Sequence, residues 1–163
     1  MKAGIGTDIH KLAKGRKLIL GGVEIPFDKG LLGHSDADVL IHAVCDAILG
    51  AAALGDIGLH FPDTDENFKG ISSLKLLSKV NEMIRKKGCF ILNIDSTVIA
   101  QIPKLAPFRK EMESNIANAL GINENLVNVK FKTAEGLGFI GKGEGIMAEC
   151  VVMMRSRKDR YAD

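Results

Sequence analysis

Three side chains that could bind a metal stand out by their type and spacing. Asp8 and His10 are two residues apart in the stretch 4–10, which we expect to be a short strand, so both should point to one side. His42 lies further along in an apolar stretch. One carboxylate and two imidazoles suit Zn²⁺, and three protein ligands leave a fourth position open, as in catalytic zinc sites. Each motif alone is more often structural or solvated, but together they favour a metal site.

The apolar stretch around His42 predicts a buried helix over residues 36–54. Ser35 should cap its first turn, with Asp38 three residues later as a variant of the capping box. Asp38, His42 and Asp46 are spaced four apart and therefore share one face of the helix. A buried neutral polar group without a partner costs roughly 2–7 kcal/mol. This polar stripe is therefore either a structural network or the face of a ligand site.

A second group of candidates follows the strand expected over residues 127–133. Thr133 and Glu135 lie where this strand enters a glycine-rich loop. Mg²⁺ and Mn²⁺ usually take one or two carboxylates together with phosphate oxygens, so Glu135 could hold such an ion, although a lone glutamate is by default an exposed acid. Lys132, Thr133 and the backbone amides at the start of the 36–54 helix would suit phosphate oxygens.

Lys104 lies in a loop with two prolines, residues 101–107, and is either a further phosphate ligand or a solvated lysine. The chain has no G-x-S-x-G, no paired Cys/His nucleophile signature and no Walker A motif. A metal site with phosphate donors and no protein nucleophile suits a reaction whose nucleophile comes from the substrate or from water.

The elements that must position these residues alternate between strands and helices. The expected order is a strand through 8–10, a hairpin over 18–26, helices over 36–54 and 74–87, a strand over 90–100, a helix over 108–120, and strands over 127–133 and 146–154. This order predicts an α+β fold with a mixed β-sheet and helices packed on one face. We expect a single domain over residues 1–163, with 155–163 as a flexible basic tail.

Composition limits the classes of function. A chain of 163 residues that is 46% hydrophobic and 26% charged is typical of one globular domain. Its net charge of +2 is too small to indicate binding to nucleic acid or to a membrane. The three cysteines are widely spaced and form no C-x-x-C motif, and no signal peptide is evident, so we expect reduced thiols and a cytoplasmic location.

Several linked motifs resemble those of one enzyme family. In chain order they are Asp8-Ile-His10, Gly33-His-Ser-Asp-Ala-Asp38 with His42, Gly55-Asp-Ile-Gly58, His60-Phe-Pro-Asp-Thr-Asp65, Ala100-Gln-Ile-Pro-Lys104, and Thr133-Ala-Glu135 with Leu137-Gly-Phe139. Together they span nearly the whole chain. The chain resembles the 2-C-methyl-D-erythritol 2,4-cyclodiphosphate synthase family of the non-mevalonate isoprenoid pathway.

The resemblance implies a homotrimer with active sites between neighbouring subunits. It implies a lyase that converts 4-diphosphocytidyl-2-C-methyl-D-erythritol 2-phosphate into 2-C-methyl-D-erythritol 2,4-cyclodiphosphate and CMP. It also implies zinc on Asp8, His10 and His42, and a second divalent cation, Mg²⁺ or Mn²⁺, held with the help of Glu135. A metal-dependent hydrolase of nucleotide diphosphates stays open as an alternative, as does a non-catalytic trimer that binds an anionic metabolite.

The resemblance also assigns roles to the remaining site residues. His34 and Thr133 would position the phosphates and stabilise the transition state. The residues expected to bind substrate are Ser35, Asp56, Gly58, Phe61, Pro62, Asp63, Thr64, Asp65, Ala100, Gln101, Ile102, Pro103, Lys104, Leu105, Ala106, Lys132, Ala134, Phe139 and Lys142. Within this set, residues 100–106 would form the cytidine pocket, Asp56 and Gly58 would lie at the ribose, and residues 61–65 would contact the methylerythritol phosphate.

The chain departs from the family pattern at Lys142, where members usually carry arginine. In the family this position, near Glu144, lines a cavity on the trimer axis in which isoprenoid diphosphates can sit. Lysine keeps the charge but lacks the bidentate fork of a guanidinium. The departure puts axial ligand binding in doubt and leaves the expected catalytic residues intact.

Overall fold

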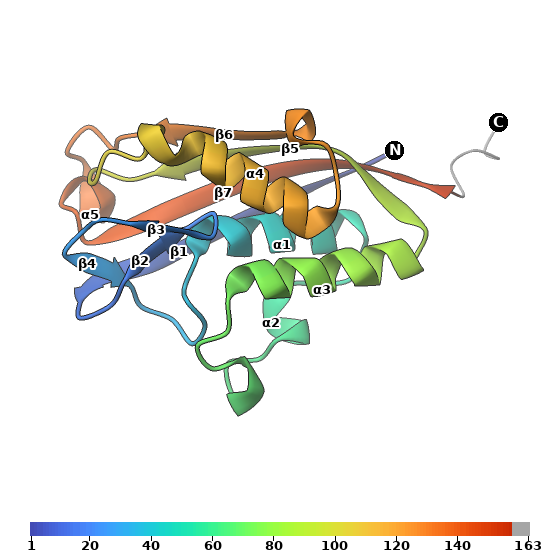
Figure 1. Cartoon of the computed structure of the whole chain (residues 1–163), viewed down its shortest axis with the longest axis horizontal. Coiled ribbons are helices and arrows are strands. Elements are labelled where there is room, and N and C mark those ends of the chain that lie inside the picture. Colours follow the sequence, from blue (N-terminus) through green and yellow to red (C-terminus); the bar gives the residue numbers. More distant parts are fainter. Residues whose placement is uncertain (158–163) are drawn as a thin grey trace.

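The computed structural model describes residues 1–157 and has an α+β architecture, as expected. A five-stranded sheet has the order β4-β1-β7-β5-β6, and a separate hairpin contains β2 and β3 (Figure 1). The strands are β1 Lys2–Lys14, β2 Leu18–Leu20, β3 Val23–Ile25, β4 Lys29–Leu31, β5 Cys89–Ile99, β6 Val127–Lys132 and β7 Gly145–Ser156. β5 and β6 run parallel while the other neighbours in the large sheet are antiparallel, so the sheet is mixed.

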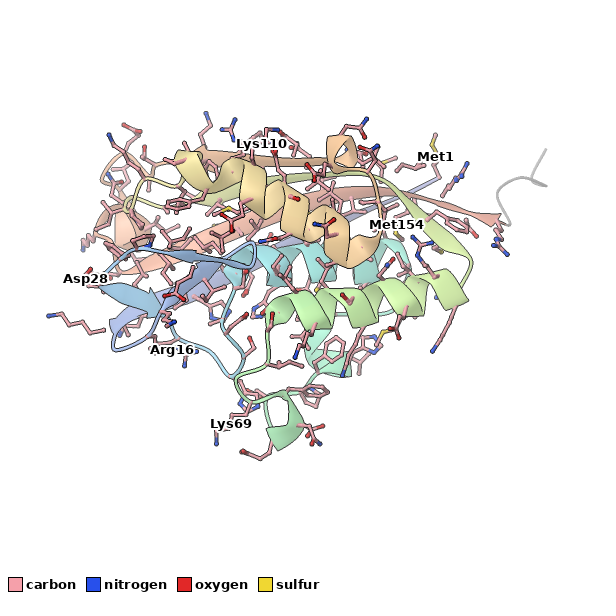
Figure 2. All side chains as sticks on the ribbon, in the orientation of Figure 1. Met1, Arg16, Asp28, Lys69, Lys110 and Met154 are labelled. Carbon is pink, nitrogen blue, oxygen red and sulfur yellow. The ribbon has the colours of Figure 1, made fainter. Side chains whose placement is uncertain are left out.

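The helices gather on one side of the large sheet (Figure 1). Helix α1 packs against β1 and β7, α4 packs against β6, and α3 contacts both of these helices. The α-helices are α1 Val39–Ala51, α2 Ile57–His60, α3 Ser73–Lys86, α4 Arg109–Leu120 and α5 Gly138–Gly141, and three short 3₁₀ turns cover Glu66–Phe68, Ala106–Phe108 and Glu124–Leu126. Charged side chains such as Lys69 and Lys110 extend away from the core (Figure 2).

Two glycines let α1 lie unusually close to β1. A Cβ atom on Gly4 would lie 2.0 Å from the Ala47 carbonyl oxygen, and one on Gly6 would lie 2.1 Å from the Ala43 carbonyl oxygen. Both contacts are with helix backbone, so a larger side chain would push the helix away. Because β1 alternates, Asp8 follows on the same face as these glycines. The close approach therefore brings Asp8 to the helix that carries His42.

The structure corrects several boundaries. Helix α1 begins at Val39, and its cap is Asp38, whose Oδ1 accepts a hydrogen bond from the Ile41 amide at 3.1 Å. Ser35 lies before the helix, because Ala37 adopts a φ of 59° that no helix continues through. The helix ends at Ala51, three residues earlier than expected. The short helices α2 and α5 were not expected from the sequence.

The C-terminal strand is longer than predicted. β7 continues to Ser156, so Arg155 and Ser156, which the sequence analysis placed in a tail, belong to the sheet. Residues 158–163 of that expected tail lie outside the described residues. Over residues 1–157, no helix has the length and apolar character needed to cross a membrane.

The face of the sheet opposite the helices carries exposed apolar side chains. Ile5 is 71% exposed, Ile9 48% and Val151 45%. These residues lie on the neighbouring strands β1 and β7, where Ile5 pairs with Val151. The face is therefore apolar and, in the single chain, open to solvent.

Candidate metal centre and substrate pockets

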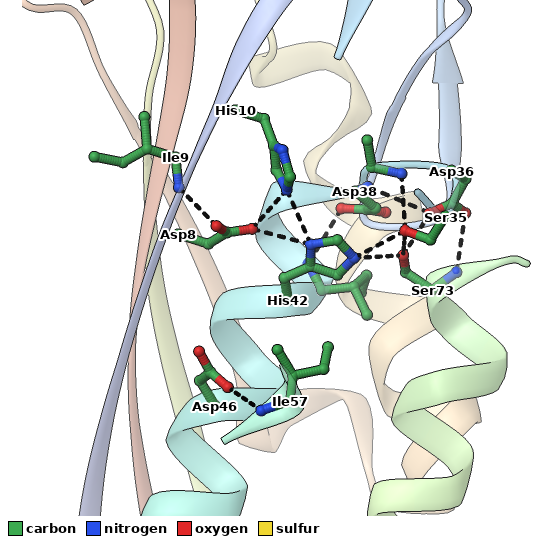
Figure 3. Close-up of polar contacts among 12 residues, drawn as sticks. Asp8, Ile9, His10, Ser35, Asp36, Asp38, His42, Asp46, Ile57 and Ser73 are labelled. Carbon is green, nitrogen blue, oxygen red and sulfur yellow. Dashed lines mark hydrogen bonds and ion pairs between the residues drawn. The ribbon is translucent and has the colours of Figure 1, made fainter. Parts of the chain in front are cut away.

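Asp8, His10 and His42 converge at one end of the contact between β1 and α1 (Figure 3). The Asp8 Oδ2 atom lies 2.9 Å from His10 Nε2 and 3.0 Å from His42 Nδ1, and the two ring nitrogens are 3.1 Å apart. One oxygen and two nitrogens at these distances can face a single ion from one side, as in three-ligand zinc sites. The prediction that these three side chains lie together as a potential metal site is therefore confirmed.

Asp8 and His10 shift each other's pKa. Burial raises the pKa of Asp8, but hydrogen bonds to His10 and His42 outweigh it and hold that pKa well below its usual value. Burial lowers the pKa of His10, while its hydrogen bond and charge interaction with Asp8 raise it more, so the net pKa is raised. Asp8 is thus an ionised carboxylate, the form that ligates a cation.

The other edge of the His42 ring faces two hydroxyl groups. His42 Nε2 lies 3.1 Å from Ser35 Oγ and 3.0 Å from Ser73 Oγ at the start of α3 (Figure 3). Asp36 receives hydrogen bonds from both the Ser73 hydroxyl and, at 3.0 Å, the Ser73 backbone amide. The ring is therefore held between the potential metal ligands and a polar network that links α1 to α3.

The polar stripe of α1 has mixed roles. Asp38 is fully buried and accepts hydrogen bonds from the amides of Gly22 at 2.7 Å and Ile41 at 3.1 Å, and burial raises its pKa to about 6. Asp46 accepts from the Ile57 amide at 2.7 Å and so fixes the start of α2. Of the three residues in the stripe, only His42 faces the potential metal ligands.

The three backbone amides immediately before α1 make hydrogen bonds within the chain. The Asp36 amide donates to Ile71 O, the Ala37 amide to Ser35 Oγ, and the Asp38 amide to Asp36 Oδ1. These three amides are therefore engaged within the chain, and the binding of phosphate by amides at this end of the helix stays a prediction.

A cavity of about 260 Å³ adjoins the three potential metal ligands Asp8, His10 and His42 (the metal cluster). Its lining contains His10, Gly33, His34, Ser35, His42, Ile57, Phe61, Asp63, Phe68 and Leu76. His34 Nε2 contacts the Asp65 carbonyl oxygen at 3.1 Å, which ties the 61–65 loop to this side of the cavity. The structure thus brings His34, Ser35, Phe61 and Asp63 next to the predicted metal ligands.

A second cavity, of about 370 Å³, lies at the other predicted substrate loop. It is lined by Ala100, Gln101, Pro103, Lys104, Leu105, Ala106, Pro107, Phe131, Lys132 and Thr133. Ile102 is absent from this lining, and its side chain is 47% exposed. The loop expected to bind cytidine and the strand end expected to bind phosphate therefore share one hollow. This cavity shares no lining residue with the cavity at the metal cluster.

Glu135 lies beyond this second cavity rather than at the metal cluster. Its side chain accepts a hydrogen bond from the Thr133 hydroxyl, and its backbone has a φ of 51°. Gln101 Oε1 accepts from the Gly136 amide at 3.2 Å, which joins the two loops. Among residues 1–157, the only cluster of at least three potential metal ligands is Asp8, His10 and His42, so Glu135 belongs to no such cluster.

The remaining predicted residues lie outside these two linings. Asp56 accepts from the Leu59 amide at 2.9 Å and caps α2, and Gly58 follows it in this exposed turn. Pro62 and Thr64 are exposed, and Ala134 accepts the Leu137 amide. Phe139 lines a third hollow with Ile9, His10, Lys11, Glu144 and Gly145. Lys142 is exposed and, across residues 1–157, forms no ion pair with Glu144.

Sequence reasoning missed Ser73 and Asp36 as neighbours of His42. The contact between Ser73 and Asp36 spans 37 positions, which no local pattern reveals. Phe68 and Leu76, which line the cavity at the metal cluster, were also missed because their hydrophobicity resembles that of ordinary core residues. Asp36 does lie within the motif Gly33 to Asp38, and its place in that motif was the sequence signal for a role at the site.

Comparison with known proteins shows the family to which the chain belongs. The sequence model of the YgbB family matches residues 1–155. The chain belongs to the YgbB family. One relative, the 2-C-methyl-D-erythritol 2,4-cyclodiphosphate synthase of Clostridium novyi, is 59% identical over 157 residues, which cover 96% of this chain and 100% of that protein. The synthase of Clostridium botulinum strain Alaska E43 is 62% identical over 151 residues, covering 93% and 96%.

Solved structures support the same family. A solved structure from Plasmodium falciparum, described as a complex of IspF with CDP, is 37% identical with a TM-score of 0.83, covering 95% of this chain and 96% of that one. The bifunctional IspDF of Campylobacter jejuni is 46% identical with a TM-score of 0.92. The match covers 95% of this chain but only 42% of that longer protein.

Proposed function

We propose that this chain is a 2-C-methyl-D-erythritol 2,4-cyclodiphosphate synthase. The observation that carries the proposal is the Asp8, His10 and His42 cluster beside one cavity, with a second cavity lined by residues 100–101 and 103–107 and by the end of β6. It is supported by membership of the YgbB family and by full-length relatives of this name. In the proposed reaction, an oxygen of the substrate 2-phosphate attacks the β-phosphorus, and the bond from the β-phosphorus to the bridging oxygen breaks and releases CMP.

The donor set fits a divalent metal ion, and we infer that Asp8, His10 and His42 hold Zn²⁺. A second cation, Mg²⁺ or Mn²⁺, is proposed at Glu135, whose carboxylate would act together with substrate phosphate oxygens. Bound divalent ions would neutralise phosphate oxygens as charge develops in the transition state. The chain itself supplies binding and orientation: an internal phosphate nucleophile, held in line, reaches an effective concentration on the order of 10⁵ M or more in well-oriented cases.

The chain's own polar groups have separate tasks in this proposal. His34, fixed by Asp65 and facing the cavity at the metal cluster, would orient the methylerythritol phosphate with Ser35 and the 61–65 loop. Thr133 and Lys132 would contact the diphosphate from the second cavity. Residues 100–106 would receive the cytidine, because this loop combines apolar walls with backbone polar groups. The three buried free cysteines are consistent with a reducing, cytoplasmic compartment.

We further propose a homotrimer in which each active site is completed by a neighbouring chain. The two cavities share no lining residues, although a single substrate must occupy both. The sheet face with Ile5, Ile9 and Val151 is apolar and exposed in the single chain, as expected of a surface that a second copy covers. An assembly through this face would bring Thr133 and Glu135 of one subunit to the metal cluster of the next.

Lys104→Ala should weaken binding of CDP without removing the metal. Lys104 lines the second cavity, and a hydrogen bond to a charged group contributes about 1.5–3 kcal/mol, so we expect roughly a 10–100-fold rise in the dissociation constant. Isothermal titration with CDP measures this change, and zinc content should stay at the wild-type value. Lys17→Ala is the matched control, since Lys17 pairs with Glu24 on the β2–β3 hairpin. An unchanged CDP affinity in Lys104→Ala would remove Lys104 from the pocket.

Product analysis tests the proposed reaction directly. Purified protein incubated with 4-diphosphocytidyl-2-C-methyl-D-erythritol 2-phosphate and Mg²⁺ should yield CMP and the cyclic diphosphate. Mass spectrometry distinguishes the cyclic product from the open-chain bisphosphate, which is heavier by one water. Formation of the open-chain product would contradict the synthase proposal and favour a hydrolase.

A further inference from the structure

The network behind His42 contains more polar groups than are needed to cap a helix. His42 presents Nδ1 to Asp8 and His10, and presents Nε2 to the hydroxyls of Ser35 and Ser73 (Figure 3). Ser73 is fully buried, and Ser35 is 7% exposed. Neither hydroxyl can therefore be satisfied freely by solvent, and the hydrogen positions in the network depend on one another.

Asp36 determines the direction of the hydrogen bonds. Its Oδ1 faces the Asp38 amide at 3.3 Å, and its Oδ2 faces the Ser73 amide at 3.0 Å, so both oxygens act as acceptors. The Ser73 hydroxyl also points at Oδ1 and must donate its single hydrogen there. The Ser73 oxygen then has only lone pairs left for the His42 ring.

Ser73 therefore cannot donate to the His42 ring. All contacts among the three side chains are satisfied when Nε2 itself carries a hydrogen and the Ser35 hydroxyl donates to Ser73 Oγ at 3.4 Å. With Nε2 protonated, His42 donates to Ser73 Oγ at 3.0 Å and to Ser35 Oγ at 3.1 Å. Ser35 Oγ already accepts from the Ala37 amide, which is compatible with this direction. The opposite tautomer would place the Nε2 lone pair against the Ser73 lone pairs. The Nε2–H tautomer leaves a lone pair on Nδ1, which, with an ion bound, would face that ion together with Asp8 and His10.

We propose that Asp36 is a positioning residue that acts through Ser73 to hold His42 in the tautomer and orientation needed to bind the metal. This inference rests on the proposed zinc site. Partners of this kind, which orient a ligating histidine through its second nitrogen, typically contribute 10–100-fold to metal affinity. Asp36 itself contacts neither His42 nor the other ligands, so its effect must pass through the Ser73 hydroxyl.

Asp36→Asn tests this chain of contacts with little change in size. The amide oxygen can still accept from the Ser73 amide and hold the start of α3. The amide nitrogen would then take the place of Oδ1 and donate to Ser73 Oγ, which frees the serine hydrogen to point at His42 Nε2. The long hydrogen bond from the Asp38 amide to Oδ1, at 3.3 Å, is lost in this variant. We expect zinc affinity of the full-length protein, measured by competition with a chromogenic chelator, to fall roughly 10–100-fold. Glu124→Gln is the matched control, because Glu124 also accepts from a serine hydroxyl, that of Ser114 at 2.8 Å, far along the chain from the metal ligands.

A double-mutant cycle with Ser73→Ala separates this path from loss of a nearby negative charge. If Asp36 acts through the Ser73 hydroxyl, Asp36→Asn should change zinc affinity little once Ser73 is alanine. Equal effects of Asp36→Asn in both backgrounds, or no effect in either, would overturn the proposal. Thermal unfolding of each zinc-loaded variant measures any change in fold stability. If Asp36→Asn does not fold, Ser73→Ala alone decides, since a wild-type zinc affinity in that variant would overturn the proposal.

The zinc site and the positioning role can fail separately. Wild-type protein that binds no zinc, or His42→Ala that binds it normally, would contradict the metal site itself. Wild-type protein that binds zinc through His42 while Asp36→Asn binds it equally well would contradict only the role of Asp36.

Discussion

His42→Ala is expected to lose its zinc and its turnover while keeping its fold. Wild-type protein should retain about one zinc ion per chain, because three ligands converge on one point. Removing His42 leaves one carboxylate and one imidazole, too few to hold the ion through gel filtration. Metal stabilisation of phosphate charge contributes several kcal/mol, so turnover should fall on the order of 10³-fold or more. Metal analysis by atomic emission and a product assay measure the two losses.

The control for this variant is another histidine. His60 hydrogen-bonds to the Leu54 carbonyl oxygen at 2.8 Å and is not part of the metal cluster, so His60→Ala should retain zinc. Alanine is well tolerated inside helices, and circular dichroism of His42→Ala should match the wild type. Stoichiometric zinc in purified His42→Ala would show that the ion, if present, binds elsewhere.

Two inactive variants should restore activity to each other when they are assembled together. His42→Ala damages the cavity at the metal cluster, and Glu135→Ala damages the loop beside the second cavity. If each active site combines the first cavity of one subunit with the second cavity of its neighbour, random co-assembly leaves about a quarter of the sites with neither substitution. Every mixed trimer isolated through two different affinity tags has one undamaged site of three, so this preparation should show about a third of the wild-type activity.

This complementation depends on how the two cavities are distributed between chains. If both halves of a site came from one chain, each subunit of the mixture would carry one damaged half, and the mixed protein would be as inactive as either parent. Two separately purified variants, combined without subunit exchange, provide the background rate. Light scattering on the same samples measures the oligomer, and a monomeric, active protein would contradict the proposed trimer.

Local periodicity was enough to predict that Asp8, His10 and His42 come together as a potential metal site. Strand alternation placed Asp8 and His10 on one side, and the apolar stretch around His42 marked a buried helix, so their meeting needed only that the helix pack on the strand. Gly4 and Gly6 provide this contact, and the sequence showed them only as part of a strand. The fold class followed from the order of strands and helices in the same way.

The errors arose where two local patterns competed or where contacts were long-range. Ser35 and Asp38 are both good capping residues. Asp38 is the cap because the backbone at Ala37, with a φ of 59°, prevents the helix from starting before it. The network of Asp36 and Ser73 joins segments that no periodicity connects. The separation of the two cavities is likewise a property of tertiary packing.

The origin of the oxygen atoms in the products tests cyclisation most directly. The reaction is run to completion in ¹⁸O-labelled water, and CMP and the methylerythritol product are weighed by mass spectrometry. If the 2-phosphate of the substrate attacks the β-phosphorus, the bond that forms uses an oxygen already in the substrate, and neither product acquires label. If water is the nucleophile, one product must carry one ¹⁸O. Unlabelled products with a cyclic diphosphate are the predicted result, and label incorporated during turnover would contradict the synthase and establish a hydrolase.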